Sequence, residues 1–385
     1  MNSTRSSHSP VSADPGAPQA LDTLVIGAGP AGIGTALALD AVDDLIHGTV
    51  ERGEIGGSFR HWPSRQTFLT PSFTGNGFGA TDLNAVHPLT SPAFSLGVDY
   101  PDGEQYAKYL RSVVKHFQLP VATEIEVTSL RREPEGFVAT TASGPIPART
   151  VVWAGGEFQD PTVPSFTGKR AVVHSSRHGA WQPCEGHVVV IGGYESGIDI
   201  ACHHVEHGAE VTVLDAEAPW DAGEGSDPSF RLAPRSRMRL KSAQATGRLA
   251  LRPVHAAGVR REGDRWDVAL QGGGRVVADT PPIAATGFGP GLGPAGHLFE
   301  RREDGWPLVD EDDQSTVAEG LFLAGPALRH GTQQFCFIYK FRQRHAHVAR
   351  LIGESLGKDC SGLEAWRRAG MLTEDVAACG AECAC

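Results

Sequence analysis

The feature that most constrains the fold is a glycine-rich turn near the N-terminus. An apolar run at residues 24–26 predicts a buried strand, and an alanine- and leucine-rich run from residue 35 predicts a helix. The turn GAGPAG joins them, and its glycines permit a tight turn, close approach of the backbone to a diphosphate, and close packing of helix on strand. Unpaired N–H groups at the helix start attract phosphates. We assign dinucleotide contact to Gly27, Gly29, Pro30, Ala31 and Gly32.

An acidic residue follows the next predicted strand. That strand spans Gly48 to Val50, and Glu51 closes it, 51 − 27 = 24 positions after the first glycine of the turn. This spacing suits a carboxylate that accepts hydrogen bonds from ribose hydroxyls. We assign Glu51 and the adjacent Arg52 to the same cofactor contact. Because strand, turn, helix, strand and acid agree in order, the sequence predicts an α/β fold with a Rossmann-type dinucleotide-binding unit.

The same order of elements begins again 192 − 27 = 165 positions later. An apolar strand HVVVI leads to the turn GGYESG, a helix, and a strand that ends in an acid 215 − 192 = 23 positions after the first glycine. Short alternating strands follow each copy. Such a repeat implies two related nucleotide-binding units, with one unit per cofactor as the economical interpretation. We assign the second contact to Gly192, Tyr194, Ser196, Gly197 and Asp215.

The remaining segments are interpreted around these two units. Apolar spacing over Gly103–Phe117 predicts an amphipathic helix, and the stretch from Gly56 to Phe78 is expected to be a functional loop. After Gly291 no third glycine turn of this kind begins, and residues 320–357 are expected to complete the first unit with a strand, a loop and one long helix. The predicted division is a disordered leader at 1–20, a first domain at 21–160 and 288–357, an inserted second domain at 161–287, and a tail at 358–385.

Composition limits the partners. The formal net charge of −11 argues against nucleic acid, whose phosphates need a basic face. No apolar run approaches the roughly 20 residues that cross a bilayer, so we expect no membrane partner. The leader has no apolar signal-peptide core, which favours a cytoplasmic protein with mostly reduced thiols. We expect a small-molecule substrate and consider a homodimer as the assembly.

These motifs resemble the two-dinucleotide-fold flavoproteins, which include flavin-dependent monooxygenases and pyridine-nucleotide disulfide reductases. The resemblance covers about residues 21–357 and implies FAD at the first glycine turn and NADH or NADPH at the second. The loop GGSF with Trp62 resembles the flavin-adjacent loop of the monooxygenase branch. The helix after Gly331 resembles one aimed at the flavin ring, where a helix start at Thr332–Gln334 would stabilise negative charge. The residues that the resemblance adds to the cofactor site are Gly57, Ser58, Trp62, Gln66, Gly287, Gly325, Thr332 and Gln333.

Three positions depart from the family pattern. Tyr194 stands where the second turn usually has its middle glycine, so a side chain crowds the place of the diphosphate. Pro326 replaces an acid that the family commonly uses near the ribityl chain. Phe166 and Gly168 match the monooxygenase motif F-x-G-x-x-x-H, but five residues instead of three separate Gly168 from His174.

The leading hypothesis is an FAD-dependent NAD(P)H oxidoreductase of monooxygenase-like type, which passes electrons to oxygen and a small substrate. The absence of a C-x-x-C pair supports this choice. Residues 61–72 are similar to a loop of bacillithiol-disulfide-reductase-like proteins, which keeps a reductase of low-molecular-weight disulfides open. A flavin-binding protein with impaired nicotinamide binding is the third hypothesis. Asp215 favours NADH, whereas arginines 231, 235, 237 and 239, expected in a loop, keep NADPH open.

The remaining hypotheses concern catalytic and metal-binding roles of cysteines. Cys336 is expected in the first turn of the flavin-facing helix, where the helix start would lower its pKa, although a buried packing role is the alternative. We name Cys336 and Arg60 as catalytic candidates, and Arg60, Trp62 and Gln66 as pocket residues. Three thiols near the C-terminus could chelate Zn²⁺, Cu⁺ or trivalent arsenic or act as a redox tail, unless the terminus is unstructured. These metal candidates are Cys379, Cys383 and Cys385.

Overall fold

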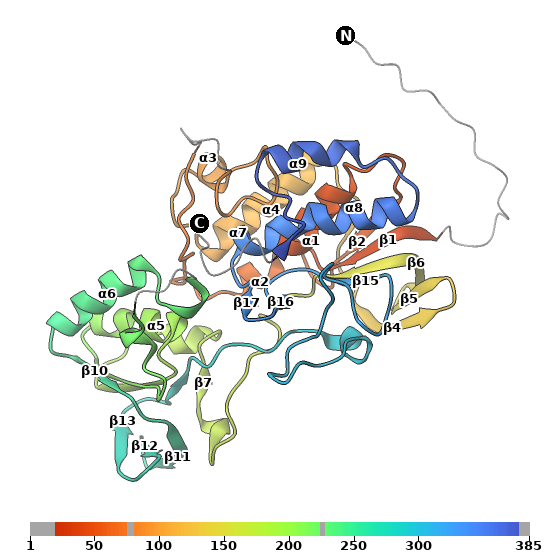
Figure 1. Cartoon of the computed structure of the whole chain (residues 1–385). Coiled ribbons are helices and arrows are strands. Elements are labelled where there is room, and N and C mark those ends of the chain that lie inside the picture. The colour runs from red at the N-terminus through yellow and green to blue at the C-terminus, as the bar shows by residue number, and fades with distance from the viewer. Residues whose placement is uncertain (1–19, 75–80, 224–227, 377–385) are drawn as a thin grey trace.

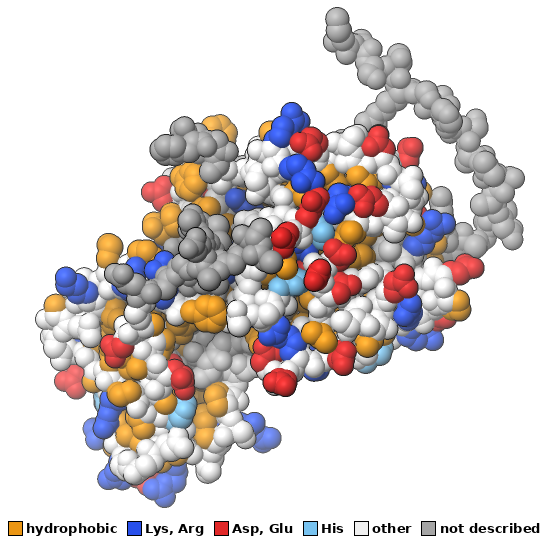
Figure 2. All heavy atoms as spheres, viewed as in Figure 1, with side chains coloured by type: hydrophobic (Ala, Val, Ile, Leu, Met, Phe, Trp, Pro, Cys, Tyr) orange, Lys and Arg blue, Asp and Glu red, His pale blue; other side chains and the backbone are white. Residues whose placement is uncertain are grey.

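The structure, a computed structural model, describes residues 20–74, 81–223 and 228–376. Two α/β units lie beside each other in Figure 1, with the second, mostly green unit next to the red, orange and blue first unit. On the face drawn in Figure 2, basic and acidic side chains are interspersed. No helix within the described ranges combines the length and apolar character needed to cross a membrane. The metal candidates Cys379, Cys383 and Cys385 lie outside the described residues.

The first sheet is built on β1 (Leu21–Ile26), which is buried from its second residue onward. β1 pairs in parallel with β2 (His47–Val50) on one side and with β6 (Gly144–Trp153) on the other. The first half of β6 also pairs antiparallel with β5, and its last three residues pair in parallel with β15. The strand order is therefore β3-β2-β1-β6-β5-β4, with β15 beside β6. The other strands are β3 (Val121–Ala122), β4 (Val127–Glu133), β5 (Gly136–Thr141) and β15 (Leu321–Leu323).

Helices of the first unit begin where local sequence signals allow them. α1 (Pro30–Leu39) is buried along its length between the sheet and α8 (His345–Ser355). α4 (Gly103–Phe117) has the predicted bounds, since Asp102 and Gln105 form a capping box at its start. Two short helices complete this region, α2 (Gly57–Arg60) and α3 (Pro92–Leu96).

The second unit repeats the strand, turn and helix plan. Its sheet has the order β10-β9-β8-β14-β7, and all its pairs are parallel. A three-stranded antiparallel sheet, β11-β12-β13, packs beside it. The strands are β7 (Val173–His174), β8 (His187–Ile191), β9 (Glu210–Leu214), β10 (Leu249–Arg252), β11 (Ala256–Glu262), β12 (Arg265–Leu270), β13 (Arg275–Ala278) and β14 (Ile283–Ala284). The helices are α5 (Glu195–Glu206) and α6 (Pro234–Ala245).

Two chain segments link the units and run beside each other. Thr162 and Thr286 exchange side-chain hydrogen bonds to each other's carbonyl oxygens, at 3.0 and 2.5 Å. Pro161 and Phe288 form an isolated antiparallel bridge next to them. The fold class predicted from the sequence, two Rossmann-type units in an α/β protein, is confirmed. The domain bounds stay a prediction, and two of them fall within these segments.

The C-terminal part differs from the sequence prediction. The long helix expected after Gly331 is wrong, because the chain first forms a hairpin of β16 (Arg329–His330) and β17 (Gln333–Gln334). Helix begins only at α7 (Ile338–Phe341), and a 3₁₀ turn separates it from α8. α9 (Glu364–Arg368) ends the described helices. The basic loop expected around residue 235 is also wrong, because arginines 235, 237 and 239 lie on α6.

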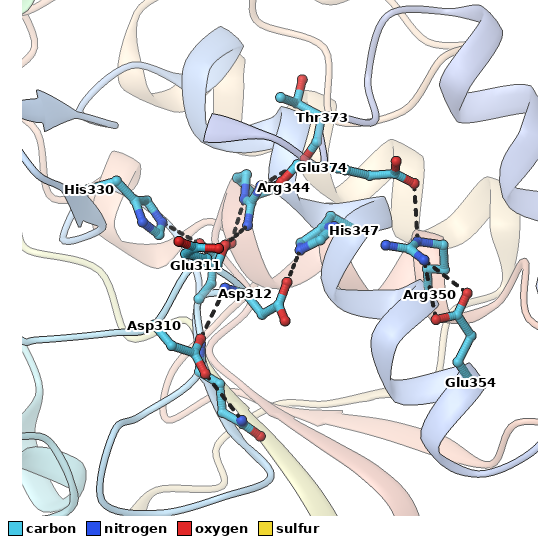
Figure 3. Close-up of polar contacts among 12 residues, drawn as sticks. Asp310, Glu311, Asp312, His330, Arg344, His347, Arg350, Glu354, Thr373 and Glu374 are labelled. Carbon is cyan, nitrogen blue, oxygen red and sulfur yellow. Dashed lines mark hydrogen bonds and ion pairs between the residues drawn. The ribbon is translucent and has the colours of Figure 1, made fainter. Parts of the chain in front are cut away.

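A buried ion-pair network holds the hairpin to the C-terminal segment. Figure 3 shows the acidic loop that precedes β15 meeting side chains from α8 and its surroundings. Asp313, which has no exposed surface, accepts hydrogen bonds from His330 at 2.6 Å and from Arg344 at 2.8 Å. Arg344 also donates to the carbonyl oxygens of Glu311 and Thr373, at 2.6 and 2.8 Å. The position of the hairpin therefore depends on residues that are distant in sequence.

Candidate functional site

A cavity of about 390 Å³ lies at the carboxyl end of the first sheet and extends to the second unit. Its wall includes Gly27 of the first turn and Ser196 in the first turn of α5. It therefore reaches from the first predicted nucleotide contact to one residue, Ser196, of the second. The predicted site residues that line it are Gly27, Gly29, Pro30, Ala31, Glu51, Arg52, Gly57, Ser58, Trp62, Gln66, Ser196 and Cys336.

The first glycine turn has the geometry that close backbone approach requires. Gly27 has φ +109°, and an added Cβ would lie 2.4 Å from the Ala154 carbonyl oxygen. An added Cβ at Gly32 would lie 1.8 Å from the Gly27 oxygen, so only glycine lets α1 lie this close to β1. Around Gly29, by contrast, nothing described lies within 4 Å of a Cβ. The turn is thus tight on the protein side and open on the cavity side.

The start of α1 offers free hydrogen-bond donors to this open side. Gly29 is its N-cap, and no side chain among the described residues caps it. The first N–H groups of a helix have no partner within the helix, and the helix dipole makes this end positive. Glu51 lies beside the turn, where its carboxylate accepts from the N–H groups of Ala28 and Gly53 at 2.8 and 2.9 Å. The arrangement can hold a diphosphate on backbone amides and a ribose on the remaining carboxylate lone pairs.

Aromatic side chains form one wall of the cavity. The Phe59 ring lies 4.9 Å from that of Trp62 and 5.7 Å from that of Phe68, and these three residues line the cavity. α2, which carries Phe59, approaches α4 so closely that a Cβ at Gly103 would lie 2.1 Å from the Phe59 oxygen. Arg60 is exposed and forms ion pairs with two glutamates outside the cavity wall. The expected pocket role of Arg60 is therefore not supported by its position.

The second turn repeats the backbone of the first. Gly192 has φ +99°, and an added Cβ at Gly197 would lie 1.9 Å from the Gly192 oxygen. Asp215 accepts from the Gly193 N–H at 2.7 Å, as Glu51 does from Ala28. Tyr194 takes the place of Gly29, and its hydroxyl donates to the Arg231 oxygen at 2.9 Å. Nine predicted nucleotide or flavin residues lie outside the cavity wall: Gly32, Gly192, Tyr194, Gly197, Asp215, Gly287, Gly325, Thr332 and Gln333.

The predicted helix start beside the cavity is wrong. Thr332 is exposed in a turn, and Gln333 belongs to β17, so no helix dipole acts there. Cys336 precedes α7 and is not helical. Its thiol lines the cavity and donates to the Ser229 hydroxyl at 3.2 Å. Burial raises the pKa of Cys336, which is the opposite of the lowering expected for a helix start.

Two cavity-side residues were missed by the sequence analysis. Ser229, from the second unit, also accepts a hydrogen bond from the buried Lys340 ammonium at 2.9 Å, so it joins the units beside Cys336. Glu157, just after β6, lines the cavity. The only sequence signal for Glu157 was its place directly after a glycine pair at a strand end. Within residues 20–74, 81–223 and 228–376, no group of three or more His, Cys, Asp or Glu side chains could hold a metal.

The comparisons with known proteins agree with this geometry. A family model described as pyridine nucleotide-disulphide oxidoreductase matches residues 24–325. Bacilliredoxin reductase Bdr of Bacillus subtilis (strain 168) is 26% identical over 357 residues, covering 86% of this chain and 97% of that protein. The "uncharacterized oxidoreductase CzcO-like" of Geobacillus kaustophilus (strain HTA426) is 32% identical over 189 residues. That match covers 47% of this chain and 50% of that protein, so the chain spans about half the length of this curated relative.

A solved structure gives the same result for the fold. The flavin-containing monooxygenase from Stenotrophomonas maltophilia superposes with a TM-score of 0.68 at 19% identity, over 88% of this chain and 99% of that chain. The family model covers most of the sequence, from β1 to the glycine that follows β15. Two Rossmann-type units and an open first turn are what a flavin and a pyridine nucleotide require. The chain therefore belongs to the pyridine nucleotide-disulphide oxidoreductase family of flavin-dependent oxidoreductases.

Proposed function

We propose that this protein is an FAD-dependent NAD(P)H oxidoreductase of monooxygenase-like type, acting with oxygen on a small substrate. When bound, the flavin supplies the redox chemistry by accepting hydride from the nicotinamide nucleotide and passing the electrons on. The observation that carries the proposal is the continuity of one cavity from Gly27 in the first unit to Ser196 in the second.

In this proposal, the chain's own residues bind and orient the two cofactors and shield the cavity from water. Amides at the start of α1 hold the flavin diphosphate, and Glu51 holds the ribose. Phe59, Trp62 and Phe68 line the cavity with aromatic rings and would exclude water from a flavin bound there. Asp215 accepts hydrogen bonds at the second turn and favours NADH over NADPH, because a carboxylate repels a 2′-phosphate.

The thiol chemistry of the cavity supports the monooxygenase-like choice. Among the described residues that line it, Cys336 is the one cysteine, so no dithiol pair stands there. The raised pKa keeps its thiol protonated and poorly nucleophilic at neutral pH. Both observations disfavour a cysteine relay between flavin and a protein disulfide.

A second candidate is a reductase of low-molecular-weight disulfides. Cys336 lines the cavity, where a small disulfide could meet it, and the chain is similar to a bacilliredoxin reductase. The third candidate, a flavin-binding protein with impaired nicotinamide binding, is favoured by Tyr194, which fills a position that Gly29 leaves open.

One experiment separates the candidates. Flavin-loaded protein is mixed with NADH or NADPH without oxygen, and flavin bleaching is followed. Bleaching, then slow reoxidation in air with a delayed release of hydrogen peroxide, supports the monooxygenase-like function. Rapid anaerobic reoxidation by glutathione disulfide with release of two thiols per flavin supports the reductase. If neither nucleotide bleaches the bound flavin, the third candidate, a flavin-binding protein, is supported and the proposed function is refuted.

A further inference from the structure

Glu157 presents a carboxyl group to the cavity without a partner. It follows the carboxyl end of β6, lines the cavity and is half-buried. No described group donates a hydrogen bond to its side chain, and no described Lys, Arg or His nitrogen lies within 4.0 Å of it. Glu51, which lines the same cavity, has both carboxylate oxygens on backbone amides. The Glu157 carboxyl is therefore left for whatever fills the cavity.

The backbone of Glu157 is held firmly although its side chain is not. The Asp160 N–H donates to the Glu157 oxygen at 2.8 Å, which closes a turn. The Gln159 amide donates to the oxygens of Gly155 and Gly291, both at 3.0 Å. A hydrogen-bonded loop that carries an unpaired carboxyl is the arrangement expected at a ligand-binding wall, because a partly buried polar group without a partner is costly unless a ligand or water satisfies it.

A buried cation faces the same region without a carboxylate of its own. Arg329 is 8% exposed, and its guanidinium lies 4.0 Å from the centre of the Trp306 ring. It donates to the oxygens of Pro326 and Leu328, at 2.6 and 2.8 Å. None of the described carboxylates lies within 4.0 Å of it. This cation acts on Glu157 across a longer distance.

These surroundings set the protonation of Glu157. The pKa of Glu157 is raised to about 7, because the raising effect of burial exceeds the lowering effect of the Arg329 charge. The Cys336 thiol, with its own pKa raised, is the other titratable group facing it. A carboxyl with this pKa changes its proton occupancy readily near neutral pH when a nearby charge changes. The other charged residues of the cavity wall are Glu51, Arg52 and Glu126, and Arg302 and Asp304 face Arg329.

We propose that Glu157 is a proton-binding site coupled to the charge of the cofactor that fills the cavity. The inference rests on the proposed function, because that charge becomes negative when a bound flavin is reduced. The proton balance is simple: two electrons and one proton enter the flavin, and one further proton from solvent converts the Glu157 carboxylate to the acid. A new negative charge nearby raises a carboxyl pKa by about one to three units. At pH 8 the uptake is then about 0.4 to 0.9 extra proton per flavin, for a rise of one to three units.

The test is the slope of the flavin midpoint potential against pH, measured by anaerobic spectroelectrochemistry on the flavin-loaded full chain. This slope reports the number of protons taken up per two electrons. We expect about 1.4 to 1.9 protons at pH 8 in the wild type, depending on how far reduction raises the pKa of Glu157. Glu157→Gln keeps the shape but cannot titrate, and it should show one proton at this pH. Glu126→Gln removes an exposed carboxyl at the rim of the same cavity and should behave as the wild type.

Two outcomes would overturn the inference alone: a one-proton slope in the wild type, or a slope above one proton that Glu157→Gln retains. If Glu157→Gln does not hold flavin, the infrared difference spectrum of the wild type decides. Reduction should produce a carboxylic-acid C=O band near pH 8, and its absence would overturn the inference. A wild type that binds no flavin would instead overturn the proposed function and the inference together.

Discussion

Replacing His345 by leucine is expected to make the protein less sensitive to acid. The His345 ring is 1% exposed at the start of α8 and lies against α1, where a Cβ on Gly34 would be 2.1 Å from its Nδ1. Neither ring nitrogen has a hydrogen-bond partner among the described residues. Burial, with a smaller effect of Arg342, lowers the pKa of His345 to about 3. The ring is therefore neutral in the folded protein and takes a proton only on unfolding.

The sign and size of the effect follow from proton linkage. Between pH 6.5 and about 3 the unfolded chain binds more protons at His345 than the folded chain, so stability falls as the pH falls through this range. Above pH 6.5 the full contribution is present. From pH 7 to pH 5 the loss due to this group is about 2 kcal/mol. Because pH 5 still lies above the folded-state pKa, the unfolded-state pKa determines this loss.

Urea unfolding followed by circular dichroism at pH 7 and pH 5 measures this loss of stability. Between these pH values, the free energy of unfolding of the wild type should fall by about 2 kcal/mol more than that of His345→Leu. His87, whose pKa burial lowers to about 4, contributes equally to both proteins and cancels. His178→Leu, at an exposed histidine, should keep the acid loss of the wild type. An equal acid loss in His345→Leu and wild type would refute the reasoning.

The first turn, the cavity thiol and the buried ion pair give three further predictions. Gly27→Ala should lose bound flavin, read as flavin absorbance per polypeptide, because its Cβ clashes with backbone at φ +109°. Gly144→Ala, at φ +117° with open space around its Cβ, carries only the backbone strain of about 1–3 kcal/mol and should retain flavin. Alkylation of Cys336 by iodoacetamide, located by mass spectrometry, should be slow at pH 7 and rise about tenfold per pH unit, since burial raises its pKa; a plateau below pH 9 would contradict this. Asp313→Asn should cost about 3–5 kcal/mol in urea unfolding, because buried Arg344 loses its carboxylate, and a loss below about 1 kcal/mol would count against the pair.

Local pattern alone was enough to predict the two strand, turn and helix units. Gly27 and Gly192 both have positive φ, and Gly32 and Gly197 both allow a helix to touch the preceding turn. These demands act over a few neighbouring residues, so spacing in the sequence expresses them directly. The helix at Gly103–Phe117 was predictable for the same reason, because its apolar face and its cap are local.

Only the tertiary structure decided what surrounds the cavity. The helix predicted from Thr332 begins instead at Ile338, because a hairpin held by the buried His330–Asp313 contact replaces its first turn. Glu157 and Cys336 line the same cavity as the first glycine turn, although they come from segments far apart in sequence. Their burial sets their pKa values, and burial depends on how the units pack. A linear pattern describes neighbours along the chain, whereas desolvation and pairing depend on neighbours in space.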